Sequence, residues 1–574
     1  MSAHSLSEEQ SAAATASTNH LMVLAPPGCG KTELLGYRAA HLIPELLPNQ
    51  QILALTFTNR AKANLGLRLR EILGVARMRK FVTVRNFHGH ATELILAHGR
   101  TVGLRPDLLT LPRTSTLSRA LAASGAEGAV RSAAEALLGE LKRRPLSDAE
   151  VLVEIADRST DPGRAVALKV ESARQEANQL HYGDLLRHAQ RILQIPTVAH
   201  LYQSHFGAIL VDEFQDMSLQ HLDLVRQTCL ADRTYVGDPD QGIFTWAGAA
   251  PALVEATLRQ ECGQPLRLRE SYRSSPGVLA IVNQICADIG GTADLVAAQP
   301  DQWPEGGCSA RLEFPDNNLE AAGVRQVAAG VLDAIPNASV GIISRAAWRR
   351  SEIDSAFRTS GLAVRRWDFS VDDPATLGFI RDLVTRLPRG ASIQDARNAA
   401  LASAEPADVD TKEQLEDAFD VLLQTTHSTI RAALQEVRVT DPREPVGPGV
   451  HLLNGHTGKG QQFDWVIVVG LEEGHLPGGR ARSVASLAEE ERTLLVMLSR
   501  ARHGVVTTRV MSTKGKFGPY QPKPSRWWRL INAQHDSLSA VLDHVSRLSS
   551  DSQQRPPSST ALANPAVSPP DSGK

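Results

Sequence analysis

The 574-residue chain has few cysteines, and their spacing excludes several classes of protein. The five cysteines, Cys29, Cys229, Cys262, Cys286 and Cys308, are widely scattered and include no Cys-x-x-Cys pair. This spacing argues against a zinc site or an iron–sulfur cluster and predicts a reduced, cytoplasmic compartment. We therefore expect no metal cluster.

Long apolar runs and a strong charge imbalance are also missing. No run approaches the ~18 apolar residues that a membrane helix needs, and the N-terminus "MSAHSLSEEQ" has no basic-then-apolar signal. We expect no membrane association. Lys plus Arg number 61 against 63 Asp plus Glu, a net charge of −2. This balance neither suggests nor excludes nucleic acid, because binding needs only a local basic groove.

Apolar runs typical of buried strands alternate with helical patterns in two parts of the chain. In the first part they occupy residues 21–24, 52–57, 81–84, 208–211 and 233–237, and in the second 340–344, 464–470 and 504–508. This alternation predicts the α/β class with parallel, doubly wound sheets. A length of 574 residues also exceeds what one core supports.

Each α/β part is interrupted by a polar, mostly helical stretch, which gives seven expected segments. The first α/β domain comprises residues 1–100 and 181–268, with a helical insertion at 101–180. The second comprises 269–371 and 450–548, with a short helical insertion at 372–449. The Ser/Pro-rich tail, 549–574, is expected to be disordered.

Residues 21–35, "LMVLAPPGCGKTELL", resemble a phosphate-binding loop between a strand and a helix. Such a loop needs small residues whose backbone N–H groups converge on phosphate, a Lys for the outer phosphates and a hydroxyl for Mg²⁺. Gly28, Gly30, Lys31 and Thr32 supply these parts. Ala25 replaces the usual first glycine and is small enough for the turn. The alternative is a chance glycine-rich turn.

A second segment, "ILVDEFQDMS", places two acids at the end of an apolar strand. Asp212 is the expected metal-side carboxylate, and Glu213 the expected polariser of the attacking water. Adjacent acids after a strand can instead be solvated turn residues. With the phosphate loop upstream, the pattern predicts an Mg²⁺-dependent NTPase.

Further segments follow in a family order: "LSEEQSAA" (6–13), "ALTFTNRAKANLGLRL" (54–69), "TVRNFHGHA" (83–91), "VGDPDQGIFTWAGA" (236–249), "LRESYRSS" (268–275), "LNGHTGKGQQFDWVIVVGLEEGHLP" (453–477) and "EEERTLLVMLSRARHG" (489–504). Together they resemble the UvrD/Rep-type superfamily 1A DNA helicases over about residues 5–530. The resemblance implies two RecA-like P-loop NTPase domains, the cofactors ATP and Mg²⁺, and a nucleotide bound between the domains.

The resemblance also implies roles for individual residues. Gln10 would read adenine, Tyr272 would stack on the base and Gln462 would lie near the ribose. The implied catalytic set is Lys31, Asp212, Glu213, Gln241, Arg273 and Arg500. The implied nucleotide-binding set is Gln10, Ala25, Pro26, Pro27, Gly28, Cys29, Gly30, Lys31, Thr32, Glu33, Tyr272, Arg273, Gln462 and Arg500, with Thr32 and Asp212 on the metal.

Single-stranded DNA and its junctions with duplex are the implied substrate. The corresponding contact residues are Phe57, Thr58, Asn59, Arg60, Phe87, His88, Phe244, Trp246 and His456. Base–aromatic stacking suits a translocating motor because it is indifferent to sequence. The alternative is that the aromatics belong to the core and that the charges are merely solvated.

Three positions depart from the family pattern: Glu270 replaces the usual Asn, Gln462 the usual Glu, and Ala247 a common basic residue. The insertion at 372–449 is also shorter than in UvrD and Rep, and in this it is similar to the helicase subunit of Gabija anti-phage defence. A trimmed insertion suggests altered regulation or dependence on a protein partner, such as a nuclease or repair factor.

The sequence therefore predicts an ATP-dependent 3′-to-5′ translocase on single-stranded DNA that unwinds duplex, in repair, recombination or anti-phage defence. The alternative is a nucleotide-gated subunit that binds DNA ends or a partner and unwinds little. The short insertion favours the alternative, and the full set of DNA-facing motifs favours the motor.

Overall fold

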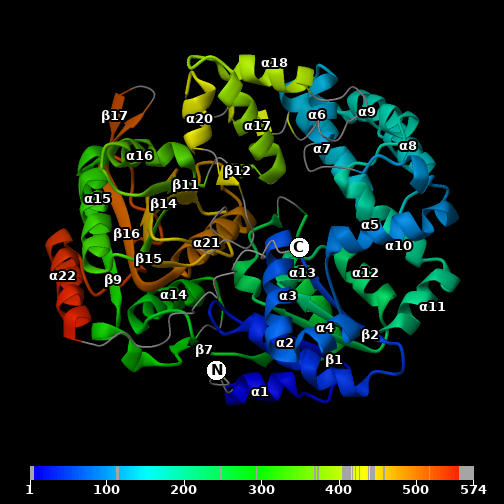
Figure 1. The fold of residues 1–574 in the computed structure, drawn as a ribbon, viewed down its shortest axis with the longest axis horizontal. Coiled ribbons are helices and arrows are strands. Elements are labelled where there is room, and N and C mark those ends of the chain that lie inside the picture. Colours follow the sequence, from blue (N-terminus) through cyan, green and yellow to red (C-terminus); the bar gives the residue numbers. More distant parts are fainter. Residues whose placement is uncertain are drawn as a thin grey trace, which may run out of the picture.

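The computed structural model describes residues 6–111, 116–245, 248–291, 294–367, 370–371, 374–403, 415, 418–419, 422–423, 425, 427–436, 438–439, 446–456, 459–515 and 518–554. Two mostly parallel sheets with helices packed around them dominate the fold (Figure 1). This arrangement confirms the α/β class. Within the described ranges, no helix is both long and apolar enough to cross a membrane.

The first sheet has the strand order β3-β2-β4-β5-β1-β6, and all its pairings are parallel. Its strands are β1 (His20–Leu24), β2 (Gln51–Thr56), β3 (Val82–Asn86), β4 (Phe206–Asp212), β5 (Asp232–Gly237) and β6 (Leu266–Arg267). Helices cover both faces of such sheets, so their strands are almost continuously apolar. The helices are α1 (Glu8–Ala14), α2 (Lys31–Leu42), α3 (Asn59–Leu73), α4 (Val75–Phe81), α5 (Phe87–His98), α10 (Tyr182–Leu193), α11 (Pro196–His205), α12 (Leu219–Thr228) and α13 (Pro251–Cys262).

Residues between α5 and α10 form α6 (Thr116–Ala123), α7 (Gly128–Lys142), α8 (Asp148–Asp157) and α9 (Arg164–Glu176). Their leucine, valine and alanine side chains form a small core of their own. Within the described part of residues 101–180, the structure has helices and one isolated bridge, Thr110 to Gln179, but no strand. The helical period of this stretch is therefore confirmed.

The second sheet has the order β11-β14-β10-β15-β16-β17, with β9 also paired to β16. Its strands are β9 (Cys308–Asp316), β10 (Ser339–Ser344), β11 (Val364–Arg366), β14 (Gly449–Asn454), β15 (Phe463–Val469), β16 (Ala501–Gly515) and β17 (Gly518–Tyr520). Only the β16–β17 pairing is antiparallel. The helices around it are α14 (Pro276–Asp288), α15 (Asn317–Ala334), α16 (Ser351–Arg358), α21 (Val484–Leu498) and α22 (Leu538–Gln554). A short separate pair joins β7 (Glu270–Ser271) to β8 (Val296–Ala297).

The second helical stretch contains α17 (Pro374–Arg386), α18 (Ile393–Ser403) and α20 (Ile430–Glu436), joined by a small core. It also contains strand pairing, between β12 (Ser370–Val371) and β13 (Arg438–Val439). The strand β13 lies within the expected mostly helical stretch, 372–449, and β12 lies just before it. The helix α22 runs to Gln554, beyond residue 549, where the sequence predicted that order ends. Residues 555–574 lie outside the described chain.

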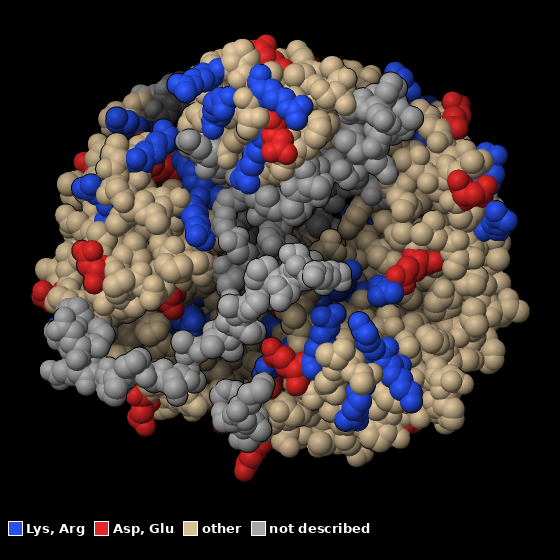
Figure 2. Space-filling model, in the orientation of Figure 1, with Lys and Arg blue, Asp and Glu red and all other residues tan. Residues whose placement is uncertain are grey.

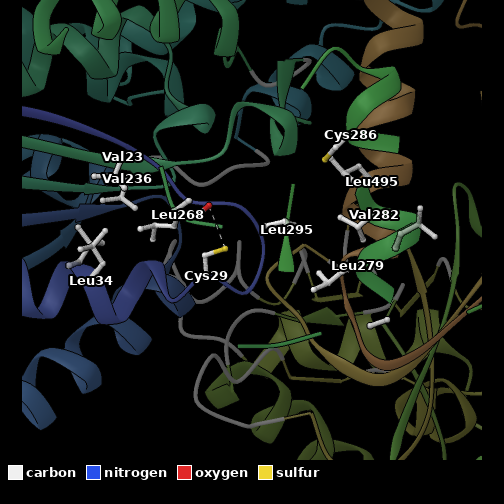
Figure 3. Packing of buried hydrophobic residues seen from close by; sticks show 14 of the residues in the cluster. Val23, Cys29, Leu34, Val236, Leu268, Leu279, Val282, Cys286, Leu295 and Leu495 are labelled. Atoms are coloured by element: carbon white, nitrogen blue, oxygen red, sulfur yellow. Dashed lines mark hydrogen bonds between the residues drawn. The ribbon is translucent and has the colours of Figure 1, made fainter. Parts of the chain in front are cut away.

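The first sheet's phosphate-loop region and the second sheet's helices share one continuous apolar core. Val23, Leu34 and Val236 lie on the first-sheet side of this core, and Val282 of α14 and Leu495 of α21 lie on the other (Figure 3). Because both halves contribute to one core, side chains from distant segments meet at the boundary between the sheets.

Candidate functional site

A cavity of about 790 Å³ opens where the carboxyl ends of the first sheet's strands meet the second sheet. It is lined by Pro27, Gly28, Gly30, Lys31, Thr32, Glu33, Thr58, Arg60, Ala61, Asn64, Arg68, Asp212, Glu213, Gln241, Tyr272, Arg273, Lys459, Gly460, Gln462, Arg500 and Arg502. A volume of this size suits a nucleotide-sized ligand. Most of the predicted phosphate-binding and catalytic side chains are therefore brought together.

The loop between β1 and α2 needs glycine at two positions. Gly28 has φ 85° and Gly30 has φ 77°, both in the left-handed region. A Cβ on Gly28 would lie 2.4 Å from Ser271 Oγ, and one on Gly30 would lie 2.5 Å from Gln10 Nε2. Ala25 has no such φ, and its methyl group is fully buried in the shared core. An alanine is therefore compatible with the first position of this loop.

Lys31 is the first residue of α2, where helix N-H groups and the helix dipole favour an anion. Its Nζ lies 3.0 Å from Glu213 Oε2. Burial opposes the charge of Glu213, but Lys31 and Lys459 outweigh it and hold the pKa of Glu213 below its usual value. Glu213 also has φ 57°, a strained value for a residue with a side chain. The fold therefore keeps an ionised carboxylate in a fixed position beside the loop lysine.

Asp212, at the end of β4, differs from Glu213 in that its surroundings raise its pKa instead of lowering it. Burial and the adjacent Glu213 carboxylate raise its pKa. Within the described residues, its Oδ1 is buried and has no hydrogen-bond partner. An orphaned carboxylate oxygen near the Thr32 hydroxyl in one cavity is the kind of oxygen donor set that Mg²⁺ prefers. The residues present therefore fit a nucleotide with its magnesium ion.

Two arginines reach the cavity from the second α/β domain. Arg500, between α21 and β16, is buried, and its Nη2 donates to Gln241 Oε1 at 2.9 Å. Arg273 Nη1 donates to the Ser499 carbonyl at 3.1 Å, while its Nε lacks a partner among the described residues. Burial lowers the pKa of Arg500 to about 9, with Arg273 contributing. Two cations held together in this way are suited to an anion carrying several charges.

Lys459 makes a second contact between the two α/β domains, which the sequence did not indicate. Its Nζ lies 2.6 and 2.8 Å from the Asp216 carboxylate oxygens and donates to the Gln241 carbonyl at 3.0 Å. Asp216 follows the predicted Asp212–Glu213 pair by a few residues, and Lys459 follows His456. The two motifs are 243 residues apart, so no local pattern could have paired them.

Four predicted nucleotide contacts do not line this cavity: Gln10, Ala25, Pro26 and Cys29. Gln10 is 4% exposed, and its amide group donates to the Cys29 carbonyl at 2.9 Å and accepts from Ser7 N at 3.1 Å. Its side chain thus braces the loop, and its expected role in reading adenine stays a prediction. Tyr272 lines the cavity and is 41% exposed, and its hydroxyl donates to Glu270.

The predicted DNA contacts of the first domain form an aromatic cluster around His221. The Phe57 and Phe87 ring centroids lie 4.9 Å apart, and His221 lies 4.7 Å from Phe87. Phe87 is fully buried, so the core alternative is correct for it and it has no free face for a base. His88 stacks on Tyr182 at 4.0 Å. Phe57 remains partly exposed, which leaves its prediction open.

Thr58 and Arg60, expected to contact DNA, line the candidate nucleotide cavity instead. The neighbouring Asn59 pairs with Asn86. The Thr58 hydroxyl also caps α3 by accepting from Ala61 N. Arg68, further along the same helix, α3, lines the same cavity and pairs with Glu33. The sequence interpretation assigned Thr58 and Arg60 to DNA and omitted Arg68.

Phe244, from the first α/β domain, and His456, from the second, come together at the boundary between the domains. Their ring centroids lie 6.4 Å apart, and Lys459 Nζ lies 4.6 Å from the Phe244 centroid. His456 also lines a separate hollow of about 400 Å³ with Arg345 and Arg480. Trp246 and Ala247 lie outside the described residues.

Basic side chains gather over α3 and α4 on the face shown in Figure 2. The sequences of these two helices contain Arg60, Lys62, Arg68, Arg70, Arg77, Arg79 and Lys80. The near-neutral net charge therefore coexists with a local basic surface, which a polyanion requires.

Comparison with known proteins gives two family matches. A model described as the UvrD/REP helicase N-terminal domain matches residues 6–260, and one described as the UvrD-like helicase C-terminal domain matches residues 403–510. Together they cover more than half of the chain.

Curated proteins similar to the chain include the ATP-dependent DNA helicase UvrD2 of Mycobacterium tuberculosis, which is 27% identical over 92% of this chain and 82% of the relative. DNA helicase II of Escherichia coli is 30% identical over 50% of this chain and 41% of its own length. DNA helicase II of Haemophilus influenzae is 29% identical over 47% of this chain and 38% of its own length.

Proposed function

The chain belongs to the UvrD-like helicases of superfamily 1A, and on this premise we propose that it moves 3′ to 5′ along single-stranded DNA. Its two sheets are the RecA-like domains of an ATP-dependent DNA helicase. The direction of movement rests on the family alone.

One observation carries the proposal: both RecA-like domains supply charged groups to a single cavity. Arg500 and Arg273 come from the second domain, and Lys31 comes from the first. A phosphate chain bound there would draw all three cations together, and its cleavage would weaken that attraction. Domain closure and opening would then follow the hydrolytic cycle.

The proposed chemistry uses the electrostatic difference between the two adjacent acids. Glu213 is held ionised and accepts a hydrogen bond from the Gln215 amide at 2.6 Å, so it can orient and polarise a water molecule. Thr32 and Asp212 would hold Mg²⁺, which supplies charge neutralisation on the phosphate oxygens when bound. Arg273 and Arg500 would stabilise the charge that develops on the transferred phosphoryl group.

The connection to DNA is proposed to run through Lys459. Its ammonium group contacts the Phe244 ring on one side and the Asp216–Gln241 pair on the other. Motion of the nucleotide site would therefore be transmitted directly to a surface that presents aromatic rings to unpaired bases. Phe57, Phe244, Trp246 and His456 are the proposed base contacts.

We further propose a cytoplasmic location and a role in repair, recombination or anti-phage defence, with a nuclease or repair factor as partner. The second candidate function is a nucleotide-gated subunit with little processive unwinding. The observation that favours it is the small size of the helical stretch between β12 and β13, whose apolar core is modest in the described residues.

The test is ATP hydrolysis by the purified full chain with no nucleic acid, single-stranded DNA, duplex DNA or RNA. Strong stimulation by single-stranded DNA supports the motor. A strand-displacement assay on substrates with 3′ or 5′ overhangs then tests polarity. Activity that ignores every nucleic acid, or that needs duplex ends or an added protein, supports the gated subunit instead.

A further inference from the structure

A group of metal-ligand side chains lies at the edge of the second sheet, where α22 packs on β9 (Figure 1). Cys308 is the first residue of β9, His535 precedes α22, and His544 lies within α22. One candidate ligand atom from each residue lies within 4.8 Å of the other two. The nucleotide cavity includes none of these residues.

Backbone hydrogen bonds hold His535 beside Cys308. His535 N donates to the Ser309 carbonyl at 3.0 Å, and Arg311 N donates to the His535 carbonyl at 2.9 Å. The loop thereby adds one residue of parallel pairing to the edge of β9. The Gln534 side chain also accepts from Ser309 N at 2.9 Å. Hydrogen bonds to the edge of the sheet thus fix the backbone of His535, without a contribution from its imidazole ring.

A carboxylate, Glu305, approaches His544 from the turn before β9. Its Oε2 lies 3.0 Å from His544 Nδ1, and its carboxylate also accepts from Arg547. Glu305 has φ 51°, a conformation that costs energy for a residue with a Cβ. Gly306 and Gly307, also left-handed, continue this turn. The strained backbone directs the carboxylate toward α22.

Two members of the cluster are buried, and two are at least partly exposed. Cys308 is 0% exposed and His544 is 2% exposed, beside a core that includes Val541 and Val545. The His535 side chain is partly exposed, and the Glu305 side chain is 47% exposed. Cys308 is a free thiol. A buried neutral thiol behaves as a small apolar group, and a cation bound beside it would hold the sulfur as a thiolate.

We propose that Cys308, His535 and His544 bind one zinc-type divalent ion that fixes α22 to β9. One thiolate sulfur and two imidazole nitrogens are ligand types that Zn²⁺ accepts, with a water molecule in the fourth position of a tetrahedral site. Glu305, itself paired with Arg547, would orient the His544 ring as a supporting partner. Binding would release the thiol proton of Cys308 to solvent and form the sulfur–metal bond.

The arrangement differs from another acid–histidine group in the chain. Asp148, Asp184 and His188 also lie close together, but Arg187 already pairs with both carboxylates at 2.5 and 2.6 Å. That group is neutralised by protein cations and needs no metal. In the proposed site, the protein cation beside the cluster is Arg547, which pairs with Glu305. Glu305 also pairs with His544 of the cluster.

The experiment uses the full chain, stripped with a chelator and dialysed against Zn²⁺ alone. Bound zinc is measured by elemental analysis, and Co²⁺ is used in parallel for its thiolate charge-transfer band. The test variants are Cys308→Ser and His535→Gln. The matched controls are Cys286→Ser, another buried thiol, and His98→Gln, another partly exposed histidine.

We expect the wild type and both controls to bind one Zn²⁺ per chain, to show the charge-transfer band with Co²⁺ and to unfold at a higher temperature with Zn²⁺. Each test variant should lose at least about 10- to 100-fold in affinity, because loss of a direct ligand costs no less than loss of a supporting one. If Cys308→Ser does not fold, His535→Gln decides, since its side chain is partly exposed.

The proposal is overturned if stripped wild type takes up no zinc, or if both test variants retain wild-type affinity. Glu305, His544 and Arg547 would then form only an ion-pair network that ties the turn to α22. Because the readout is metal content, the result is independent of whether the chain hydrolyses ATP or unwinds DNA.

Discussion

Replacing Arg500 by alanine tests the most specific feature of the cavity, the contact between its two halves. Arg500 donates to Gln241 Oε1 at 2.9 Å, to the Val496 carbonyl at 2.9 Å and to Ser499 Oγ at 3.2 Å. If this guanidinium stabilises the transferred phosphoryl group, its loss lowers kcat by about 10³- to 10⁵-fold. At 1.36 kcal/mol per tenfold, that is about 4–7 kcal/mol of transition-state stabilisation.

The same substitution should affect folding far less. Three hydrogen bonds are lost, each with a net value of about 0.5–1.5 kcal/mol. The alanine also removes a buried charge, and the burial that lowers the pKa of Arg500 shows that this charge is costly. We therefore expect a loss of only about 1–3 kcal/mol in the free energy of unfolding, so the folded variant should be almost inactive.

The assay is steady-state ATP hydrolysis with saturating single-stranded DNA, with thermal unfolding measured on the same samples. The control is Arg502→Ala: Arg502 lines the same cavity, but its side chain is 48% exposed and lies 3.9 Å from Asp464. We expect the control to lose less than about tenfold in kcat, because an exposed, screened charge stabilises the transition state weakly. A folded Arg500→Ala variant within threefold of wild-type kcat would refute the reasoning.

Three further predictions concern the loop lysine, the bridge between the domains and acid stability. Lys31→Ala should abolish ATP hydrolysis with the fold intact, and wild-type turnover by this variant would show that the site assignment is wrong. Lys459→Ala should lower the free energy of unfolding by about 3–5 kcal/mol, because it leaves Asp216 buried and unpaired. In urea denaturation, adding Asp216→Asn to this variant should recover part of that loss, and no recovery would mean that the two residues are uncoupled. Burial lowers the pKa of His221 to about 3 and of His90 to about 4, so between pH 6.5 and pH 4 only the unfolded chain takes up their protons. The free energy of unfolding should therefore keep its full value above pH 6.5 and fall by up to about 1.4 kcal/mol per histidine per pH unit toward pH 4. Equal urea midpoints at pH 7 and pH 5 would contradict this prediction.

Strand prediction from the sequence succeeded where apolar runs were continuous and failed where they were not. The runs at 52–57 and 208–211 became β2 and β4, buried on both faces. By contrast, β9 reads "CSARLEFPD", with a glutamate and an arginine among its apolar residues, and was not predicted. It pairs with β16 alone, so one edge of it is free of strand partners in the described sheet. Its existence depends on that long-range pairing.

Aromatic residues show the limit of motif reasoning most clearly. Phe57 and Phe87 occupy similar motif positions, and the sequence could not say which of them is accessible. Phe87 begins α5 and points into the core, whereas Phe57 follows β2 and stays partly exposed. The outcome depends on His221, a residue of α12 that covers Phe87 at 4.7 Å.

The sequence by itself determined the phosphate loop and the acidic strand end, because both are local structures. Gly28 and Gly30 adopt left-handed backbone that few other residues tolerate, and Lys31 directly follows them at the start of a helix. Asp212 and Glu213 end a buried strand, and parallel strands place their carboxyl ends at one edge. These features need no contact with distant residues.

Only the tertiary structure decided which distant side chains share a charge or a ligand. Lys459 meets Asp216, Arg500 meets Gln241, and Cys308 meets two histidines that follow it by more than two hundred residues. Such contacts are set by how two sheets pack on one core. The strength of each depends on burial, since an unpaired charge is costly only where water is excluded. A linear pattern carries neither the packing nor the exclusion of water.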